Sequence, residues 1–470
     1  MTTQYKQANQ PNAMQYNNIY FVGAGGIGMA ALERYYLSRG LNVAGYDRIP
    51  SALTAKLAEE GVQISYDDSM DAVPEAFRNP ADTLVIYTPA VPASNTPLTF
   101  FHSGGFNIIK RAAALGMITR GSKAICFAGT HGKTTTSSMC AHILHCGHAG
   151  CNAFLGGILR NYGSNLLLSA TSPYSVVEAD EYDRSFHQLT PYIAVITATD
   201  PDHLDIYGTE EAYLESFAHF TTLIRPDGKL LLHTGLKLVP EAAASVDVRT
   251  YSRNEGDYHA ENVRSGDGSI HFDFVYPGGR IDNIELGVPV DINIENAVAA
   301  LAACHLAGEL EPESAAAAIA SYQGAERRFQ FHLKEQAPNG HVIIDDYAHH
   351  PAELARSIQS VRALYPQRKL TVAFQPHLYS RTRDFADEFA QALSQADEVI
   401  LTDLYPAREE PIPGVSSEII FNKIKNSEKL LISKEDFVNT LKNRNFEILL
   451  AAGAGDLSLY LPKLVESLKC

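Results

Sequence analysis

The chain has 470 residues, more than one ordinary hydrophobic core accommodates, so its length predicts two or three domains. Apolar residues make up 45% and charged residues 20% of the chain, which is usual for a globular protein. The formal net charge is −16 and no Lys/Arg-rich block offsets it, which argues against nucleic acid as a partner. A phosphorylated ligand would need local cations, helix N-termini or a metal.

The six cysteines, at positions 126, 140, 146, 151, 304 and 470, lack the short paired spacing of a zinc site. We therefore expect free thiols in a reducing cytoplasm. Residues 1–18 are polar, and we expect neither a secretion signal nor a membrane anchor there. No run reaches the roughly 18 apolar residues that a spanning helix needs. The sequence thus predicts a cytoplasmic protein without a membrane partner.

The first segment of the chain alternates short apolar strands with helical patterns, which predicts a parallel sheet. Strands are expected at 19–22, 42–46 and 83–87, and a helix at 29–39. A glycine turn, Gly23-Ala24-Gly25-Gly26-Ile27-Gly28, follows the first strand, and Asp47 ends the second. This pattern is typical of a dinucleotide site. The diphosphate of a UDP-sugar would rest on such a helix N-terminus equally well, and a tight structural turn is a third interpretation.

The second segment carries a phosphate loop, Gly129-Thr130-His131-Gly132-Lys133-Thr134, between an apolar strand at 124–128 and a helix. Glycines let backbone N–H groups approach phosphates, the lysine reaches the outer phosphates, and the adjacent hydroxyl can bind magnesium. Phe127 stands where the first glycine of the common eight-residue pattern would fall. The strand and helix around the loop nevertheless predict an ATP site with magnesium rather than a chance turn.

Two further strand ends of this segment carry acids, at the carboxyl edge where parallel sheets bind ligands. They are Glu178, Asp180 and Glu181 after a strand at 174–177, and Asp200, Asp202, His203 and Asp205 after a strand at 193–196. Magnesium takes carboxylates together with phosphate oxygens. We interpret both groups as functional, against the alternatives of solvated acidic turns and a structural histidine.

The remaining sequence predicts a β-rich stretch from about 245 to 287, a helix at 294–307, and then a third α/β segment. Strands of that segment are expected at 342–344, 370–374, 398–401 and 447–450. Polar, ring-rich loops follow the first two of them, at 345–353 and 375–383. Their arginines could grip a carboxylate or a phosphate, which indicates a site rather than helix caps and surface charge.

In combination these motifs resemble the Mur ligase family of peptidoglycan synthesis, over residues 18 to about 461. The resemblance rests on the glycine turn at 23–28, Gly-Thr-His-Gly-Lys-Thr at 129–134, Glu-Ala-Asp-Glu at 178–181, Asp-His at 202–203, Asn296, Arg-Arg-Phe at 327–329, Asp-Asp-Tyr-Ala-His-His-Pro at 345–351 and Arg-Thr-Arg at 381–383. It implies an α/β protein of three domains. These are an N-terminal Rossmann-like domain at 1–121 for a UDP-sugar, a central domain at 122–325 with a mostly parallel sheet for ATP, and a C-terminal Rossmann-like domain at 326–470 for an amino acid.

The resemblance is strongest to the branch of the family that adds L-alanine. It implies an ATP-dependent ligase that joins L-alanine to the lactyl carboxylate of UDP-N-acetylmuramate through an acyl phosphate, in cell wall precursor synthesis that serves cell shape and division. We expect a monomer or dimer. One alternative is the ligase that attaches a whole tripeptide to the same UDP-sugar. Another alternative is an NAD-dependent dehydrogenase, which would leave the phosphate loop and the acids unexplained. A third alternative is a protein that only binds its ligands, which would need a defective ATP site.

The motifs also carry residue roles over from the family. The resemblance implies catalytic roles for Lys133, His203 and His349, the last as a candidate base for the amine. It implies ATP contacts from Gly129, Thr130, His131, Gly132, Lys133, Thr134, Thr135, Asn296, Arg328 (or its neighbour Arg327) and Asp346. The UDP-sugar would contact Gly25, Gly26, Ile27, Gly28, Asp47 and Thr88, and the amino acid Tyr347, His349 and Arg381. Two magnesium ions are implied, one on Thr134 and one on Glu178 and His203.

The chain departs from the family pattern at three positions. Ala198 stands where Asn is usual, Ile292 where His is usual near adenine, and Leu378 where an Arg is expected to help hold the amino-acid carboxylate. No lysine lies between His203 and Ile224, the region where other branches keep a carbamylated lysine. The missing lysine favours the L-alanine branch, whereas Leu378 leaves the choice of amino acid open.

Overall fold

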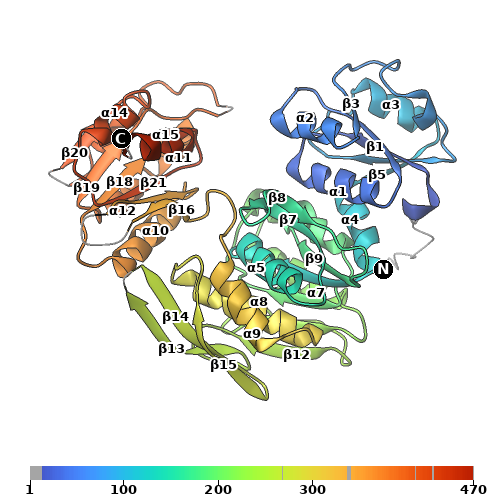
Figure 1. Cartoon of the computed structure of the whole chain (residues 1–470). Helices are drawn as coiled ribbons and strands as arrows, with labels where there is room; N and C mark the ends of the chain where they lie inside the picture. Colours follow the sequence, from blue (N-terminus) through green and yellow to red (C-terminus); the bar gives the residue numbers. More distant parts are fainter. Residues whose placement is uncertain (1–12, 267, 336–339, 408, 426–427, 469–470) are drawn as a thin grey trace. The chain divides into compact units, whose positions relative to one another are not determined.

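The computed structural model describes residues 13–266, 268–335, 340–407, 409–425 and 428–468, with the side chains of 204 and 205 left aside. Residues 1–12 of the polar N-terminal segment and Cys470 lie outside this part. The five described cysteines are free, as predicted. No helix in the described part is both long and apolar enough to cross a membrane. The described residues form four sheets (Figure 1). The chain divides into two compact units, one of residues up to 259 with 275–279 and 296–318, the other of the remainder.

The first sheet has five parallel strands in the order β3-β2-β1-β4-β5, as in a Rossmann-like fold. They are β1 (Asn18–Val22), β2 (Asn42–Tyr46), β3 (Gln63–Ser65), β4 (Thr83–Tyr87) and β5 (Asn107–Lys110), joined by helices α1 (Ile27–Ser38), α2 (Ala52–Glu59) and α3 (Thr96–Ser103) and followed by α4 (Arg111–Arg120). The three predicted strands of this segment are confirmed. Because β1 lies between β2 and β4, its carboxyl end is the point where the strand order reverses, which is where such sheets bind ligands.

The second sheet has seven strands in the order β12-β11-β10-β6-β9-β7-β8, and only the β7–β8 pair is antiparallel. The strands are β6 (Lys123–Ala128), β7 (Asn152–Leu159), β8 (Ser164–Leu167), β9 (Tyr174–Glu178), β10 (Ile193–Ile196), β11 (Lys229–His233) and β12 (Asp247–Tyr251). Strand β6 pairs with β9 on one side and with β10 on the other. The carboxyl ends of these three strands therefore meet at one edge, and they carry the phosphate loop and both groups of acids.

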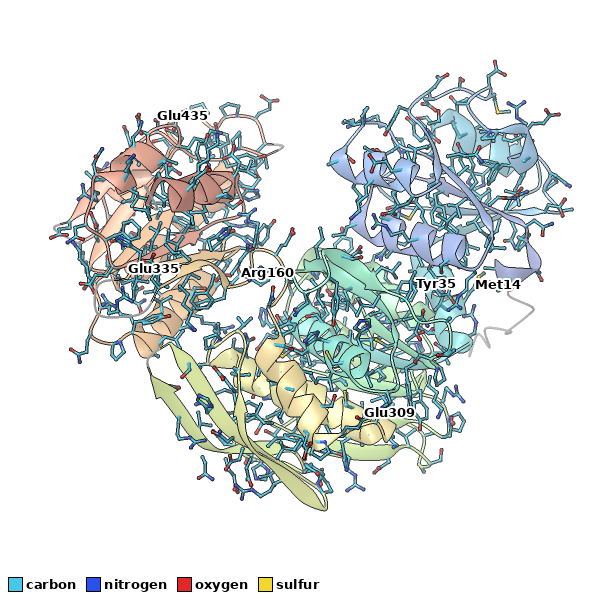
Figure 2. The ribbon with its side chains drawn as sticks, in the orientation of Figure 1. Met14, Tyr35, Arg160, Glu309, Glu335 and Glu435 are labelled. Atoms are coloured by element: carbon cyan, nitrogen blue, oxygen red, sulfur yellow. The ribbon has the colours of Figure 1, made fainter. Side chains whose placement is uncertain are left out.

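Further helices and a small sheet follow along the chain, and most residues of that sheet belong to the second unit. The helices are α5 (Lys133–Cys146), α6 (Leu204–Tyr207), α7 (Glu210–Thr222), α8 (Ile292–Ala307) and α9 (Pro312–Ser321), and the sheet has the order β13 (His259–Gly266), β14 (Ser269–Tyr276), β15 (Gly279–Glu285). The β-rich stretch and the helix predicted near 294–307 are confirmed. The hydroxyl of Tyr174 on β9 lies 2.9 Å from a carboxylate oxygen of Glu309. Glu309, which is labelled in Figure 2, follows α8 in the sequence.

The last sheet, in the second unit, has the order β16-β17-β21-β18-β19-β20, and only the edge strand β16 is antiparallel to its neighbour. Its strands are β16 (Gln330–Lys334), β17 (Val342–Asp346), β18 (Leu370–Phe374), β19 (Glu398–Leu401), β20 (Lys429–Leu431) and β21 (Ile448–Ala452). Its helices are α10 (Pro351–Leu364), α11 (Tyr379–Asp384), α12 (Ala386–Leu393), α13 (Glu418–Phe421), α14 (Phe437–Lys442) and α15 (Leu461–Leu468). The predicted alternation of strands and helices is confirmed.

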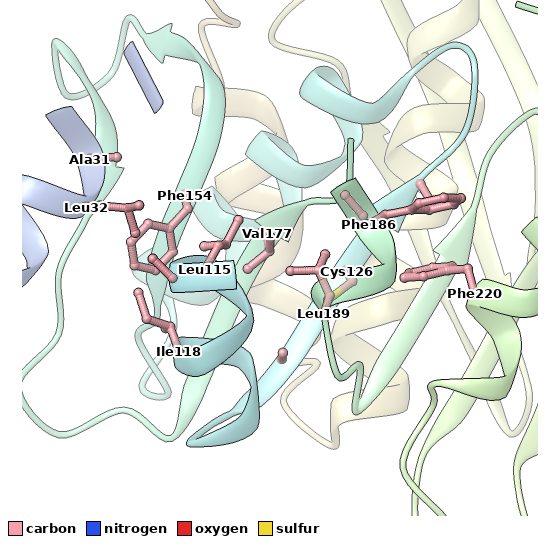
Figure 3. Close-up of a cluster of buried hydrophobic side chains, with 14 of the residues drawn as sticks. Ala31, Leu32, Leu115, Ile118, Cys126, Phe154, Val177, Phe186, Leu189 and Phe220 are labelled. Carbon is pink, nitrogen blue, oxygen red and sulfur yellow. The ribbon is translucent and has the colours of Figure 1, made fainter. Parts of the chain in front are cut away.

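A continuous hydrophobic cluster joins the helices of the first sheet to the second sheet (Figure 3). Leu32 of α1, Leu115 and Ile118 of α4, and Phe154 of β7 are all buried in it. The Phe154 ring also meets the ring of Tyr35 edge to face, with centroids 5.3 Å apart. Because buried side chains pack as densely as in crystals, this cluster fixes the start of α1 relative to the strands that carry the phosphate loop and the acids.

One buried carboxyl on α1 predicts a pH-dependent stability. Glu33 is fully buried, and neither of its oxygens has a hydrogen-bond partner among the described residues. Burial raises the pKa of Glu33 well above its ordinary value, although Arg34 opposes the shift. The fold therefore favours the protonated acid. The stability that protonated Glu33 gives the folded protein is fully present below the unfolded-state pKa of about 4.3. It is lost as the pH rises through the pKa of Glu33 in the folded protein.

We expect the free energy of unfolding of the natural protein to fall, relative to a Glu33→Gln variant, as the pH rises from about 5 to about 8. Urea denaturation of both proteins across that range measures the difference. Glu59→Gln, which neutralises an exposed acid on α2, is the matched control and should track the natural protein. Parallel stability curves for the natural protein and Glu33→Gln would show that Glu33 does not titrate as a buried acid.

Candidate active site

The phosphate loop (Gly129–Thr134) leaves the carboxyl end of β6 and enters α5 through two left-handed glycines. Gly129 has a φ of 141° and Gly132 a φ of 83°. A Cβ at Gly129 would lie 2.3 Å from Oγ1 of Thr197, and one at Gly132 would lie 3.0 Å from Oδ1 of Asn296. Both positions therefore require glycine. The loop is a backbone cradle at the N-terminus of a helix of 14 residues, where anions bind favourably.

Side chains from the neighbouring strand end hold this loop in place. The hydroxyl of Thr197, directly after β10, donates to the carbonyl of His131. The hydroxyl of Thr130 donates to the carbonyl of Asp200 at 2.6 Å and lies 2.9 Å from the hydroxyl of Tyr213. The loop is thus fastened to the end of β10 at both of its central residues, which preorganises its backbone for a ligand.

Lys133 is the first residue of α5, and its ammonium group turns back over the loop. It donates to the carbonyl of Gly129 at 2.6 Å and to Oε1 of Glu181 at 2.8 Å. Glu181 is buried, and its Oε2 has no hydrogen-bond partner among the described residues. Burial raises the pKa of Glu181, and the Lys133 charge opposes that shift. An ammonium group has three N–H donors, so one remains for a phosphate oxygen.

Thr134 and Glu178 form the metal-compatible part of the site. The Thr134 hydroxyl hydrogen-bonds the Glu178 carboxylate, and the Gly156 N–H donates to Oε2 of Glu178 at 3.0 Å. Burial raises the pKa of Glu178, opposed first by the Thr134 bond and then by Lys133. Within the described residues, no three His, Cys, Asp or Glu side chains gather into a metal site. One hydroxyl and one carboxylate beside a phosphate seat nevertheless fit magnesium, which takes few protein ligands and completes its shell with phosphate oxygens and water.

His203 lies beside the acid motif (Glu178–Glu181), although it comes from a different strand end. Its ring meets the ring of Tyr182 edge to face, with centroids 5.1 Å apart. Its Nε2 lies 3.7 Å from Oδ2 of Asp202, and its backbone has a φ of 52°. A histidine held in the left-handed region costs on the order of 1–3 kcal/mol, a strain that occurs most often at functional sites.

The glycine turn (Gly23–Gly28) forms a second anion-compatible position, at the end of β1. Asp47 places Oδ2 2.6 Å from the N–H of Gly25. Thr88 packs against Gly23, because a Cβ there would lie 2.4 Å from Cγ2 of Thr88. Gly26 precedes α1 as its N-cap, and Ile27 and Gly28 are its first two residues. The structure therefore brings all the predicted UDP-sugar residues together at one turn.

The second unit holds a ring cluster (Tyr347, His349, His377, Arg381 and Tyr405) beyond the ends of β17, β18 and β19. The ring centroid of His349 lies 5.1 Å from that of Tyr347 and 6.3 Å from that of His377. Nη1 of Arg381 is 3.4 Å from Nδ1 of His377, whose ring stacks on Tyr405. The predicted amino-acid residues Tyr347, His349 and Arg381 thus share one cluster.

Both histidines of the ring cluster favour the neutral form. Burial lowers the pKa of His349, Arg381 adds to the shift, and Glu353 opposes it. Burial, and then Arg381, lower the pKa of His377 to about 4. Nδ1 of His349 lies 2.9 Å from the carbonyl of Tyr347, so a neutral ring that donates there leaves Nε2 as the proton acceptor. His349 therefore has the chemistry of a base near pH 7.

Asp346 and Arg328 lie next to this cluster. The Asp346 carboxylate accepts hydrogen bonds from the hydroxyl of Ser357 and from the N–H of Phe329. Burial raises its pKa, while those two bonds and the Arg328 charge lower it. The guanidinium of Arg328 lies 5.7 Å from the ring centre of Tyr347, and that of Arg327 5.0 Å. The predicted ATP residues of the second unit are therefore neighbours.

The sequence prediction named no contact for several residues that the structure places in these sites. Glu181 and His377 stand inside segments that the sequence marked as functional, but their partners Lys133 and Arg381 were not predicted. Thr197 and Tyr213 left no readable signal, because their contacts depend on how β10 and α7 lie against the loop. Each of these residues contacts and orients another group of its site.

Comparisons with known proteins agree with this geometry. Family models match three consecutive stretches: Mur ligase family, catalytic domain at 18–123; Mur ligase middle domain at 127–304; and Mur ligase, glutamate ligase domain at 327–464. The UDP-N-acetylmuramate–L-alanine ligase of Phocaeicola vulgatus is 56% identical over 95% of this chain and 97% of its own length. That of Parabacteroides distasonis is 57% identical over 96% of each chain.

Solved structures give the same result. The crystal structure of UDP-N-acetylmuramate-alanine ligase from Thermotoga maritima superimposes with a TM-score of 0.78 at 27% identity, covering 96% of this chain and 99% of the other. A murein peptide ligase from Psychrobacter arcticus shares the fold, with a TM-score of 0.60 at 20% identity over 96% and 98% of the two chains. A phosphate loop with its paired lysine, a separate glycine turn and these matches along almost the entire sequence lead to one assignment: the chain belongs to the Mur ligase family.

Proposed function

We propose that the chain is an ATP-dependent ligase that joins L-alanine to the lactyl carboxylate of UDP-N-acetylmuramate in peptidoglycan precursor synthesis. One observation carries the proposal: Lys133, paired with buried Glu181, lies over a backbone cradle beside Thr134 and Glu178. This arrangement suits the outer phosphates of ATP. The relatives that bear the name of this reaction, at 56% and 57% identity over nearly the full chain, support the choice of substrates.

The reaction has two steps. An oxygen of the lactyl carboxylate attacks the γ-phosphorus of ATP, ADP leaves, and an acyl phosphate forms. The amine nitrogen of L-alanine then attacks the acyl carbon, phosphate leaves, and the amide bond is complete. In the first step Lys133 neutralises charge on the γ-phosphate oxygens, with the N–H groups of the phosphate loop around them. In the second step Nε2 of His349 accepts the proton that the amine loses.

Magnesium belongs to this proposal through the residues that would hold it. Thr134 would contact one ion, and Glu178 and His203 a second. Bound magnesium supplies positive charge against the phosphate oxygens. The contact between Thr134 and Glu178 supports placing the ions beside Lys133.

We further propose that the three segments keep the boundaries expected from the sequence, at 121 and 325. The family matches support this division into three segments: the gap between the last two matches, 304–327, contains 325, and the first match ends at 123, two residues beyond 121. The ATP would occupy the phosphate loop, the UDP-sugar the glycine turn, and the amino acid the ring cluster. We propose that the enzyme works in the cytoplasm, where ATP is available to it, and that it is a monomer or a dimer.

Phosphate release tests this function directly. UDP-N-acetylmuramate and ATP are supplied with L-alanine, L-serine, glycine or the tripeptide in separate reactions, and the rates are compared. We expect the highest rate with L-alanine, and no release without the UDP-sugar. Faster release with the tripeptide would favour the recycling ligase instead. NAD binding without any ATP-dependent phosphate release would favour the dehydrogenase.

A further inference from the structure

Arg111 connects the glycine turn to the acid motif, and none of the matched motifs includes it. It is the first residue of α4. Its guanidinium lies across Gly28, since a Cβ there would be 2.9 Å from Nη1 and 3.4 Å from Cζ of Arg111. Its Nη2 is 3.7 Å from Oδ2 of Asp180, and about a third of its side chain (32%) is exposed. One cation therefore contacts both the first turn of α1 and the motif beside Lys133.

Two carboxylates of the chain face the hydrogen-bond donors at this turn, which are the N–H of Gly25 and the guanidinium of Arg111. Asp47 accepts the N–H of Gly25 at 2.6 Å, and Asp180 faces Arg111. A backbone N–H at a helix N-terminus together with a guanidinium is the pair of donors that phosphate oxygens bind. The N–H of Gly25 and the guanidinium of Arg111, which lies against Gly28, are thus two donors at the same turn.

A cation at this turn would add to the partial charge that the helix N-terminus offers a diphosphate. The N-terminus of α1 contributes only about half an elementary charge. The chain carries a net charge of −16, and the acids Asp47, Asp180 and Glu181 lie nearby. Lys110 precedes Arg111, but its ammonium is 3.8 Å from Asp183 and is more than half exposed. Arg111 is the cation whose contact with Gly28 places it at the turn itself.

We propose that Arg111 binds the diphosphate of the UDP-linked substrate, and that Asp180 and the diphosphate exchange as its partner. The planar guanidinium matches two phosphate oxygens at once, and Arg111 then positions the sugar so that its carboxylate points toward the acid motif. Arg111 is thus a positioning residue. This inference rests on the proposed function, because it assigns a residue to the UDP-sugar of the same reaction.

The test measures binding of UDP alone by calorimetry, without ATP or amino acid. Arg111→Ala is expected to raise the dissociation constant of UDP by about tenfold or more, since hydrogen bonds to charged groups contribute strongly. Arg111→Lys keeps the charge but loses the bidentate geometry of the guanidinium, so its affinity for UDP should lie between those of the natural protein and Arg111→Ala. Lys110→Ala is the matched control, and its affinity should stay within about twofold of the natural protein. Circular dichroism and thermal unfolding confirm that each variant is folded.

Several results would overturn the proposal. Unchanged UDP binding in Arg111→Ala rules out a diphosphate contact. A loss confined to UDP-N-acetylmuramate, with UDP and UDP-N-acetylglucosamine bound as before, assigns Arg111 to the lactyl carboxylate instead. Asp180→Asn keeps the acceptor for the Tyr182 N–H but removes the charge, so it should bind UDP at least as tightly as the natural protein. Weaker binding contradicts the exchange. Failure of the proposed function shows separately, as absent phosphate release in the natural protein.

Discussion

Lys133→Ala should lower ATP-dependent phosphate release at saturating substrates by about 10²–10³-fold, the usual loss when one preorganised charge at a reacting group is removed. The ammonium group lies at the phosphate loop, held by the carbonyl of Gly129 and by Glu181. It therefore needs little reorganisation when charge develops on the γ-phosphate. Steady-state phosphate release with UDP-N-acetylmuramate and L-alanine measures the change in kcat.

The variant needs a control for folding, because it leaves the buried Glu181 without its cation. An unpaired buried carboxylate is costly, and Lys133→Ala alone could lose stability for that reason. The double variant Lys133→Ala, Glu181→Gln removes the charge as well, and thermal unfolding of both variants separates stability from catalysis. A folded double variant with a near-normal rate would remove Lys133 from the mechanism.

The strands that the sequence predicted with both ends correct all lie between two neighbouring strands of a sheet. They are residues 42–46, 83–87, 193–196, 370–374 and 398–401, which agree with β2, β4, β10, β18 and β19. In a parallel sheet covered on both sides, a strand is a continuous apolar run between polar turns, which is a local signal. Strand β7 gave no such signal, because Gly156 and Gly157 interrupt it, and it owes its place to pairing with β9.

The site was predictable as a set of residue types but not as a set of contacts. The spacing of Gly129, Gly132 and Lys133 follows from what a phosphate requires, so a motif reveals it. The pairing of Lys133 with Glu181 depends on the register in which Phe127 on β6 faces Glu178 on β9, and register is a property of the whole sheet. Contacts of this kind could not be predicted from local sequence.

The contacts that position the predicted amino-acid residues could likewise not be predicted from local sequence. Leu378 stands where the family usually has an arginine, and the structure holds it at a φ of 69° before α11. Ser380 in that helix donates to Glu409, through its N–H at 2.9 Å and through its hydroxyl at 2.5 Å. Helix α11, which carries Arg381, is therefore held by a part of the chain that the motif does not include. Which amino acid the ring cluster prefers is a question for the phosphate-release panel.

Glu178→Gln should lower phosphate release by at least about 100-fold and raise the magnesium concentration that half-saturates the reaction, since even supporting residues of metal sites cost 10–100-fold when changed. The amide keeps the size of the side chain and one oxygen for the Gly156 N–H. It loses the negative charge that a divalent ion requires. A magnesium titration of phosphate release, at fixed ATP and substrates, measures both effects.

The matched control is Asp183→Asn, which neutralises an acid just beyond the same motif whose side chain is more than half exposed and pairs with Lys110. That variant should keep the magnesium dependence of the natural protein, because Asp183 has no contact with Thr134 or Lys133 among the described residues. If Glu178→Gln lowers the rate while its magnesium dependence stays unchanged, Glu178 acts on the substrate and not through the metal. If neither changes, the ion lies elsewhere, and the contact between Thr134 and Glu178 only fastens α5 to β9.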